Sequence, residues 1–329
     1  MCLPRRFVFL INPISGTRSK AGLEAFLARQ CHLHNISFSF LQSTPHTTAA
    51  MVEMAVYDFK ATDLVACGGD GTVNIAAAAA MAADVPLGII PVGSGNGLAR
   101  TAQIPLKPSL AFKVLLNGHR QVTDAFSINQ HFGCMLSGLG MDAAVAERFA
   151  QSQRRGLYSY TTETLFQFFR ANPYQFEVEL PDFSFFTNAF FISVANSNQY
   201  GNNMTIAPQA SLSDGLLDVI IVQKMPKATL PFAIMCQMRH NKNLRNWVEK
   251  IGKQSILYFQ VPAISIKNHS HAPLHIDGDP VNAAETVRFN VLKGAFQLWV
   301  PGNEANLLLQ QSVKESSATT VTPPDNQAG

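Results

Sequence analysis

Short apolar runs alternate with longer amphipathic stretches over the first 125 residues of the chain. The runs that resemble buried strands are 6–12, 36–41, 63–67 and 86–92. The helix-like stretches that follow the first three are 20–30, 47–59 and 72–83. Continuously apolar strands separated by helices are typical of a parallel sheet covered on both faces. The pattern therefore predicts an α/β domain over residues 1–125.

From about residue 126 the pattern changes to aromatic and β-branched segments separated by polar turns. These strand-like segments are 176–180, 188–196, 217–222, 255–261, 264–268, 287–292 and 296–300. Many short strands, with helix-like interruptions only at 157–171 and 227–246, favour an antiparallel sandwich or barrel. We therefore predict a β-sandwich domain over residues 126–301, followed by a short helix-like piece and a disordered tail over 302–329.

Composition narrows the class of protein. Apolar residues make up 47% of the chain and charged residues 14%, which excludes a mainly disordered protein. A net charge of +3 with no aromatic and basic ladder argues against a nucleic-acid partner. The five cysteines form no C-x-x-C pair, and every apolar stretch is shorter than the roughly 18 residues that cross a bilayer. The absence of a disulfide pattern and of a membrane-spanning stretch in the sequence therefore predicts a cytoplasmic location.

Three small-residue loops follow the first, third and fourth predicted strands, at residues 12–16, 68–72 and 91–97. In an open parallel sheet, ligands bind at the carboxyl ends of the strands. Glycines let backbone N–H groups approach an anion, and the helix that follows adds its positive end. Together the loops predict a polyphosphate cradle. The 93–97 loop alone is equally typical of an ordinary turn, whereas the acid and threonine among the glycines of 68–72 favour a binding loop.

An acid, Asp70, stands among the glycines of the second loop. A carboxylate cannot bind phosphate directly at neutral pH, because both groups are negative. It can instead hold Mg²⁺ or accept a proton from an attacking hydroxyl. The chain lacks the G-x-x-x-x-G-K-[ST] pattern and the protein-kinase motifs, so neither of those mechanisms is predicted.

Six segments, in order, resemble the diacylglycerol kinase catalytic-domain family, which includes sphingosine, ceramide and bacterial lipid kinases. They are the 12–16 turn, the 68–72 and 93–96 loops, "SGLGMDA" at 137–143, "SLSDGLLDVIIV" at 211–222 and "HIDGDP" at 275–280, with the last three lying in the second half. The resemblance covers residues 5–300. It implies an enzyme that transfers the γ-phosphate of ATP to a lipid hydroxyl, with nucleotide bound between an α/β domain and a β-sandwich domain.

The resemblance also implies roles for individual residues. The ATP-binding positions are Asn12, Ser15, Gly16, Ser43, Thr44, Gly68, Gly69, Asp70, Gly71, Thr72, Asn74, Gly93, Ser94, Gly95 and Asn96. Asp70 is also implied in metal binding or catalysis, and Asp277 and Asp279 lie where the family places its general base.

Two further sites follow from the same resemblance. Asp142 matches an acid near the lipid head group. A second, structural metal would use the Asp214 carboxylate with backbone oxygens at Ser211 and Leu216. The implied cofactors are therefore ATP and Mg²⁺.

The chain departs from the family pattern at two places. Asp279 stands where the family usually has glutamate, and the loop reads Gly95, Asn96, Gly97, a form closer to sphingosine kinases. The acceptor lipid therefore stays open among diacylglycerol, a sphingoid base, ceramide and related alcohols. Independently of the family, two acids around Gly278 would raise the pKa of one of them, but D-G-D-P is also ordinary turn chemistry.

Residues 224–253 carry seven Lys and Arg against one acid, Glu249. This segment predicts peripheral contact with an anionic membrane, and a solvated helix face explains it equally well. A helix-like segment from Tyr158 to Phe169 is aromatic enough to line an acyl groove, although such spacing is more often plain core.

Two other functions compete with the lipid kinase. NAD kinases use a similar Gly-Gly-Asp-Gly-Thr loop, but their Asn-Glu pair appears here only at 303–304, beyond the last strand. A non-catalytic lipid- or nucleotide-binding regulator is the other. The retained acids Asp70, Asp214, Asp277 and Asp279 favour an active, ATP- and Mg²⁺-dependent lipid kinase.

Overall fold

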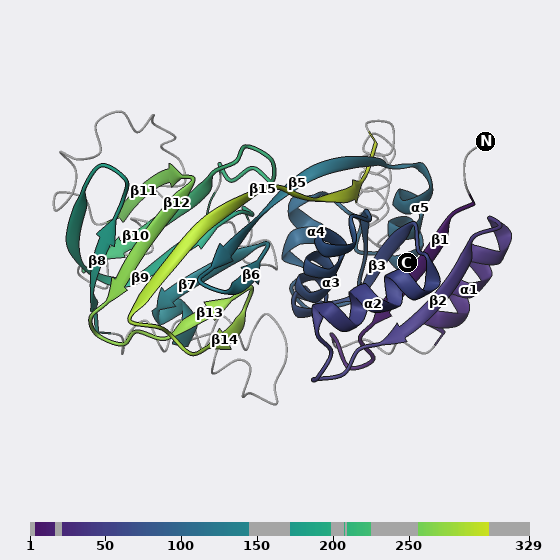
Figure 1. Cartoon of the computed structure of the whole chain (residues 1–329), viewed down its shortest axis with the longest axis horizontal. Helices are drawn as coiled ribbons and strands as arrows, with labels where there is room; N and C mark the ends of the chain where they lie inside the picture. The colour runs from purple at the N-terminus through teal and green to yellow at the C-terminus, as the bar shows by residue number, and fades with distance from the viewer. Residues whose placement is uncertain are drawn as a thin grey trace, which may run out of the picture.

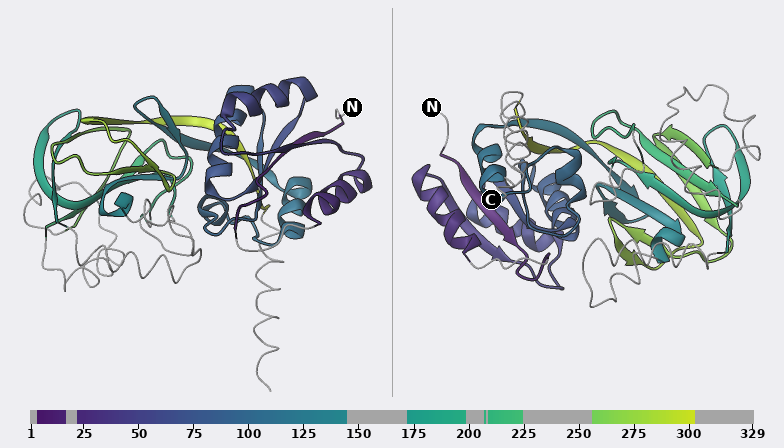
Figure 2. Two further views of the ribbon diagram at one scale, coloured as in Figure 1. Left: turned by 90° about the horizontal axis from the view of Figure 1, so that it is seen from below. Right: turned by 180° about the vertical axis from the view of Figure 1, so that it is seen from behind.

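The computed structural model describes residues 4–16, 22–144, 172–198, 207, 209–224 and 256–302. Two domains lie end to end, an α/β domain formed by the N-terminal part of the chain and a β domain formed by the later part (Figure 1). Two long strands run from one domain into the other, which Figure 2 shows from two more sides. The predicted fold class, α/β followed by all-β, is confirmed.

The first domain is built on a parallel sheet in the order β2-β1-β3-β4. Its strands are β1 (Arg6–Ile11), β2 (Ser37–Gln42), β3 (Asp63–Gly68) and β4 (Leu87–Pro91). Every residue of β3 and β4 is buried, as expected for central strands covered on both faces. Because the strands are parallel, the loops after β1, β3 and β4 emerge at one edge of the sheet.

Helices cover both faces of this sheet. They are α1 (Leu23–Leu33), α2 (Ala49–Phe59), α3 (Asp70–Ala83), α4 (Gly97–Thr101) and α5 (Pro108–Asn117). The alanine-rich α3 buries four alanines, whose small side chains allow a close approach to the sheet. The apolar spacing predicted α1 to α3 but not α5, which begins with Pro108 at a position where proline fits the first turn.

The second domain is antiparallel. Its strands are β6 (His131–Gly133), β7 (Leu136–Gly140), β8 (Tyr174–Glu179), β9 (Ser184–Ala195), β10 (Leu217–Gln223), β11 (Ile256–Val261), β12 (Ala263–Asn268), β13 (Leu274–Ile276) and β14 (Asp279–Val281). One apolar core includes inward-facing residues of β8, β10 and β12. Buried and half-buried positions alternate in β8 and β12, the period of two expected of strands with one face on the core.

The two domains share the strands β5 (His119–Ile128) and β15 (Thr286–Val300), which pair antiparallel along most of their length. The register shifts between Leu292 and Phe296, where Gly294 has a φ of 62°. Beyond this bulge β15 reaches the first domain and pairs with β4 at Leu298. The two strands predicted at 287–292 and 296–300 are therefore one strand, and the predicted boundary at residue 125 lies inside β5.

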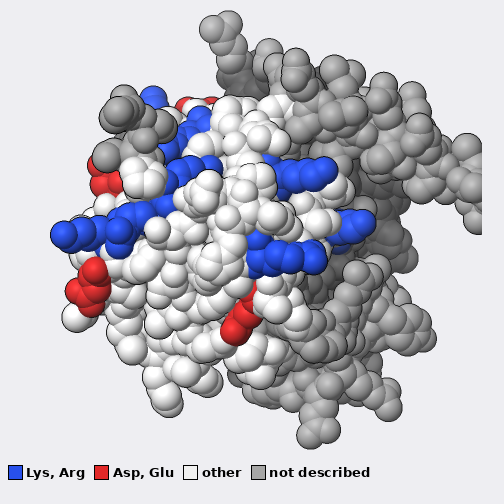
Figure 3. Space-filling view, turned by 90° about the vertical axis from the view of Figure 1, so that its right-hand side faces the viewer, with Lys and Arg blue, Asp and Glu red and all other residues white. Residues whose placement is uncertain are grey.

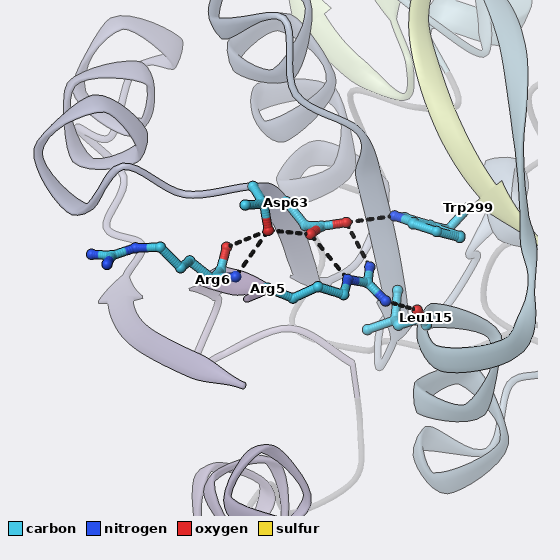
Figure 4. Close-up of polar contacts among 6 residues, drawn as sticks. Arg5, Arg6, Asp63, Leu115 and Trp299 are labelled. Atoms are coloured by element: carbon cyan, nitrogen blue, oxygen red, sulfur yellow. Dashed lines mark hydrogen bonds and ion pairs between the residues drawn. The ribbon is translucent and has the colours of Figure 1, made fainter. Parts of the chain in front are cut away.

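A buried carboxylate, Asp63, holds the end of β15 against the first domain (Figure 4). Arg5 donates to both Asp63 oxygens, at 2.6 and 3.3 Å, and to the carbonyl of Leu115. The indole Nε1 of Trp299 donates to Asp63 at 2.7 Å, and the Arg5 guanidinium lies over the same indole ring. The last turn of α5, β1, β3 and the end of β15 are thus joined by one ion-pair cluster.

Seen from the free end of the first domain, Lys and Arg side chains are spread across the face, with Asp and Glu side chains beside them (Figure 3). The basic segment 225–253 and the aromatic segment between Tyr158 and Phe169 lie outside the described residues. Within the described ranges, no helix has both the length and the apolar character needed to cross a membrane.

Candidate active site

The three loops predicted to form a phosphate cradle pack directly on one another. The backbone N–H of Asn12 donates to the Cys67 carbonyl at 3.0 Å, which joins the first loop to the end of β3. The N–H of Gly93 donates to the Gly68 carbonyl at 3.1 Å, which joins the third loop to the second. A Cβ added to Gly93 would lie 2.3 Å from the Cα of Gly69, so this contact requires glycine.

The first turn of α3 is organised by Thr72. Its side chain folds back over Gly68, where an added Cβ would lie 2.2 Å from Thr72 Oγ1. The hydroxyl also accepts a hydrogen bond from Asn12 Nδ2 at 3.3 Å. Gly68 and Thr72 are therefore a matched pair. They leave the N-terminus of α3, with its backbone N–H groups, at the centre of the loops.

Asp70 lies in this turn and braces the third loop. Its Oδ2 accepts from the N–H of Asn96 at 3.0 Å, and its Oδ1 accepts from the N–H of Gly97 at 2.7 Å. Burial raises the pKa of Asp70 to about 6, although these two N–H groups lower it, and Asp277 and Asp279 raise it further. The N-terminus of the short helix α4 is thus occupied by a carboxylate of the protein, whereas the N-terminus of α3 is not.

Asn96 gives the third loop its shape. The residue has a φ of 56°, its Oδ1 accepts from the N–H of Gly93 at 3.0 Å, and its Nδ2 donates to the Gly93 carbonyl at 2.8 Å. Arg100 Nε donates to the Gly95 carbonyl at 2.9 Å. Ser94 is half-buried between these tied positions, in the loop that follows β4.

The other predicted nucleotide residues lie at the same edge of the sheet. Ser15 is buried and donates to the Asn12 carbonyl at 3.3 Å, and a Cβ on Gly16 would lie 2.3 Å from the Val92 carbonyl oxygen. Ser43 follows β2 and donates its N–H to Ile11 at 2.8 Å. The exposed Thr44 closes a turn through Thr47. ATP contacts at these positions stay a prediction.

The second domain contributes the turn between β13 and β14. Asp277 and Gly278, with φ values of 50° and 93°, form its two central positions, which matches the type I′ turn that favours Asp-Gly. The Asp277 carboxylate is buried and accepts backbone N–H groups of Cys134, Met135 and Leu136, each at 2.9 Å.

Asn74 completes the shell around Asp277. Its Nδ2 donates to Asp277 Oδ2 at 2.7 Å and to the Phe132 carbonyl at 3.2 Å. The predicted ATP contact of Asn74 is not tested by these distances, but the amide is used at the junction between α3 and the second domain. Asp277 therefore joins two segments of the second domain, the β13–β14 turn and residues 132–136, to helix α3 of the first domain.

Asp279 differs from Asp277 in its exposure and in its hydrogen bonds. It is exposed, and its carboxylate accepts no hydrogen bond from the described residues. A Cβ on Gly71 would lie 3.1 Å from Asp279 Oδ2, so this oxygen lies against the first turn of α3. Desolvation and the neighbouring Asp277 raise the pKa of Asp279. A basic oxygen thus lies beside the helix terminus that is suited to phosphate.

Asp142, the predicted head-group acid, lies deeper in the second domain. It is 7% exposed, its Oδ2 accepts from Ser193 Oγ at 2.8 Å, and its Oδ1 accepts from the N–H of Ala143 at 2.8 Å. The imidazole Nε2 of His275 lies 3.6 Å from Asp142 Oδ2. A direct contact with a lipid head group stays a prediction.

The predicted structural metal loop is folded as a tight turn before β10. Asp214 Oδ1 accepts from the N–H of Leu216 at 3.1 Å, and Ser211 Oγ accepts from the N–H of Ser213 at 3.4 Å. Nearby Asp218 is fully buried, and its Oδ2 has no hydrogen-bond partner among the described residues. Burial raises the pKa of Asp218 to about 6, and the charge of Asp214 adds to this effect. Oxygen atoms of this kind suit a hard cation.

Magnesium at the loops would have few protein ligands. No group of three or more His, Cys, Asp or Glu side chains in the described part of the chain is placed to hold a metal ion. Mg²⁺ in nucleotide sites is commonly bound by one or two carboxylates together with substrate phosphates and water. The charges of Asp277 and Asp279 raise the pKa of Asp70, so these carboxylates lie near one another. Asp70 and Asp279 fit that mode of magnesium binding.

Comparison with known proteins agrees with this geometry. Residues 6–128 match the family model "Diacylglycerol kinase catalytic domain", and residues 136–300 match "YegS C-terminal NAD kinase beta sandwich-like domain". A Pectobacterium atrosepticum protein named "Probable lipid kinase YegS-like" is 27% identical, over 76% of this chain and 81% of its own length. A Mycobacterium tuberculosis protein named "Diacylglycerol kinase" is 30% identical, over 67% of this chain and 74% of its own.

Solved structures show the same fold. A diacylglycerol kinase from Bacillus anthracis str. Sterne superposes with a TM-score of 0.66 at 16% identity, covering 91% of this chain and 98% of that one. A second structure from the same organism reaches 0.73 with the same coverage. The two domains and the loops between them thus define a lipid kinase fold. The chain belongs to the diacylglycerol kinase family and, within it, resembles the YegS-like lipid kinases.

Two residues important for the geometry did not stand out in the sequence. Asp124, in β5, is buried and accepts the N–H groups of Gly215 and Gly294, each at 2.7 Å, which ties the predicted metal loop to the bulge of β15. His275 stands in no metal-ligand spacing in the sequence, and its place beside Asp142 appears only in the fold. The contacts of Asp124 with Gly215 and Gly294, and of His275 with Asp142, join residues far apart in sequence, so they carry no local signal.

Proposed function

We propose that the protein transfers the γ-phosphate of ATP to a hydroxyl of a membrane lipid, with Asp279 as the general base. One observation carries the proposal: the exposed carboxylate of Asp279, which accepts no hydrogen bond within the described part of the chain, lies against the N-terminus of α3 at Gly71. Phosphate favours such a terminus, and an oxygen there lies between a bound phosphate and an arriving alcohol.

In this proposal the phosphates bind the N–H groups of the first turn of α3 and the glycine loop after β4. The second terminus, of α4, is not used, because Asp70 already accepts its N–H groups. Mg²⁺, when bound, would neutralise the developing charge on the phosphates, with Asp70 as its nearest protein carboxylate. The contacts of Asp70 with the N–H groups of Asn96 and Gly97 also hold the third loop beside the first turn of α3.

The acceptor hydroxyl gives its proton to Asp279 as its oxygen attacks the γ-phosphorus, and ADP leaves. A raised pKa, caused by desolvation and by Asp277, makes Asp279 a better proton acceptor than an ordinary aspartate. Asp277 is not the base in this proposal. Three backbone N–H groups and the Asn74 amide already use its oxygens.

The acceptor is proposed only as a lipid alcohol. Relatives named lipid kinase and diacylglycerol kinase support that class. An NAD kinase is disfavoured because the chain has no Asn-Glu pair before residue 303. Contact with an anionic membrane is part of the proposal, and the excess of Lys and Arg in residues 224–253 of the sequence supports it.

The test is transfer of labelled γ-phosphate from ATP, with Mg²⁺, to diacylglycerol, a sphingoid base and ceramide in mixed micelles, with NAD alongside. We expect labelled lipid from wild type and from the control Asp182→Asn, which changes an exposed acid outside the site. Asp70→Asn should lose turnover while still binding ATP. Labelled NADP would replace the proposal with an NAD kinase, and ATP binding without any labelled product would favour a regulator.

A further inference from the structure

Four strands of the second domain place a row of residues side by side. Ser193 of β9 pairs with Gly138 of β7, Gly138 pairs with His275 of β13, and His275 pairs with Pro280 of β14. Gly138 leaves a gap in this row, and the Asp142 carboxylate fills it. A Cβ on Gly138 would lie 1.8 Å from Asp142 Oδ2.

The filled gap is buried and polar. Ser193 and His275 are 0% exposed; Ser193 Oγ donates to Asp142 Oδ2 at 2.8 Å, and His275 Nε2 lies 3.6 Å from the same oxygen, beyond hydrogen-bond length. The other ring nitrogen of His275, Nδ1, accepts the backbone N–H of Gly278 at 3.2 Å. A neutral imidazole that accepts at Nδ1 carries its proton on Nε2, the nitrogen that faces the carboxylate.

The contact with Gly278 lies at the centre of the catalytic turn. No atom lies within 4 Å of the position that a Gly278 Cβ would occupy, so the outer side of the turn is not held by packing. The His275 ring holds it from the inner side, one residue before Asp279. A general base displaced by about 1 Å loses on the order of a hundredfold in rate.

We propose that His275 is a positioning residue that couples Asp142 to the turn carrying Asp279. Through Nδ1 it fixes the Gly278 amide, and its buried ring lies directly beside the Asp142 carboxylate, the acid near the expected lipid head group. The acid expected near the acceptor and the turn that places the base then belong to one group of neighbouring residues. This inference rests on the proposed function for its catalytic consequence, but the coupling itself is a property of the fold.

The kinetic test compares His275→Phe and His275→Asn with the control His269→Phe, which changes an exposed histidine outside the row. Phenylalanine keeps the ring volume and removes both nitrogens, so kcat should fall about tenfold or more while the KM for ATP stays within about twofold. Asparagine can still accept the Gly278 N–H and should recover part of that loss. Equal kcat in wild type and His275→Phe, or no recovery in a folded His275→Asn, would overturn the proposal.

Hydrogen exchange tests the coupling without catalysis. In the peptide covering residues 274–281, the Gly278 amide should exchange about tenfold faster in His275→Phe and close to the wild-type rate in His275→Asn. If His275→Phe does not fold, His275→Gln replaces it, because its amide reaches the Nε2 position but leaves Gly278 without an acceptor.

The two readouts separate the two proposals. A wild type that labels no lipid but shows the exchange difference removes the proposed function and keeps the coupling. Unchanged exchange in a folded His275→Phe or His275→Gln removes the coupling, whatever the activity.

Discussion

The Gly68–Thr72 loop of the first domain and the Asp277–Asp279 turn of the second are alike in sequence and unlike in structure. Each places acids among glycines. In the first, the only acid, Asp70, is bound by two backbone N–H groups of the neighbouring loop. In the second, Asp277 is bound by three such groups, and Asp279 by none among the described residues.

The difference shows what separates an acid that builds a site from one that reacts in it. Glycines beside an acid allow either role, because they permit both tight turns and close approach of a ligand. The hydrogen bonds decide between them. A carboxylate with its oxygens filled by N–H groups stabilises a loop, whereas one left open beside a helix terminus can take a proton.

The strongest test of this comparison is to neutralise Asp279, the acid with no hydrogen bond from the described residues. Asp279→Asn should lower kcat by about a hundredfold to ten-thousandfold, the usual contribution of a general base, with an unchanged unfolding midpoint. Asp279→Glu restores the residue typical of the family and should stay within about tenfold of wild type. Lipid kinase assays with thermal unfolding measure both, and a stable, fully active Asp279→Asn would contradict the assignment.

Neutralising the bound acid should have the opposite profile. Asp277→Asn removes charge-assisted bonds to three N–H groups and places a donor against them, so the free energy of unfolding should fall by about 3 kcal/mol. Denaturant unfolding measures this loss, and Asp182→Asn is the matched control. If Asp277→Asn instead lost only activity, Asp277 would have to be considered as the base.

The raised pKa of Asp70 should appear in the pH dependence of the free energy of unfolding. Its pKa is raised to about 6 in the folded protein, so the folded state binds a proton that the unfolded state releases. Its contribution to stability is therefore fully present below about pH 4 and is lost as pH rises through about 6, a change of about 3 kcal/mol. The pH slope of unfolding should be shallower in Asp70→Asn than in wild type.

Asp218 has a pKa raised to a similar value by burial and should contribute a slope of the same sign. It lies at the second-domain loop, so Asp218→Asn should change stability at pH 7 without the loss of turnover expected for Asp70→Asn. Identical pH slopes in wild type and both variants would show that neither carboxyl titrates in this range.

The smallest expected effect comes from alanine substitutions at two glycines, Gly278 and Gly22. Both have a positive φ and open space around the added Cβ. Alanine at either position should cost about 1 kcal/mol of stability, because the left-handed conformation disfavours a side chain. Only Gly278→Ala should also reduce kcat, since it strains the turn that carries Asp279. Equal activity of the two variants would mean that the turn tolerates strain.

The sequence predicted the parts of this molecule that depend on local pattern. Continuous apolar runs identified β1 to β4, and glycine loops after them identified the edge where the site lies. The roles of Asp277 and Asn74 were not predictable, because they meet across a separation of 203 residues. D-G-D-P predicts a turn with two candidate bases, and only the N–H groups of distant β-strand residues distinguish them.

The path of the crossover strands escaped prediction for a similar reason. An apolar pattern indicates that residues 287–300 form strand, but it does not say that the bulge at Gly294 carries the chain back to β4. Likewise α5 is short, and its apolar face becomes meaningful only when it packs beside β4 and β15.

The return of β15 has a consequence for how the chain is made. The first domain needs the pairing of Leu298 with Leu87 and the indole of Trp299 on Asp63, both supplied by residues near position 300. On the ribosome this domain begins first and is completed last, after the whole second domain has been synthesised. A fragment ending at residue 125 would expose one edge of its sheet and is expected to aggregate rather than bind nucleotide.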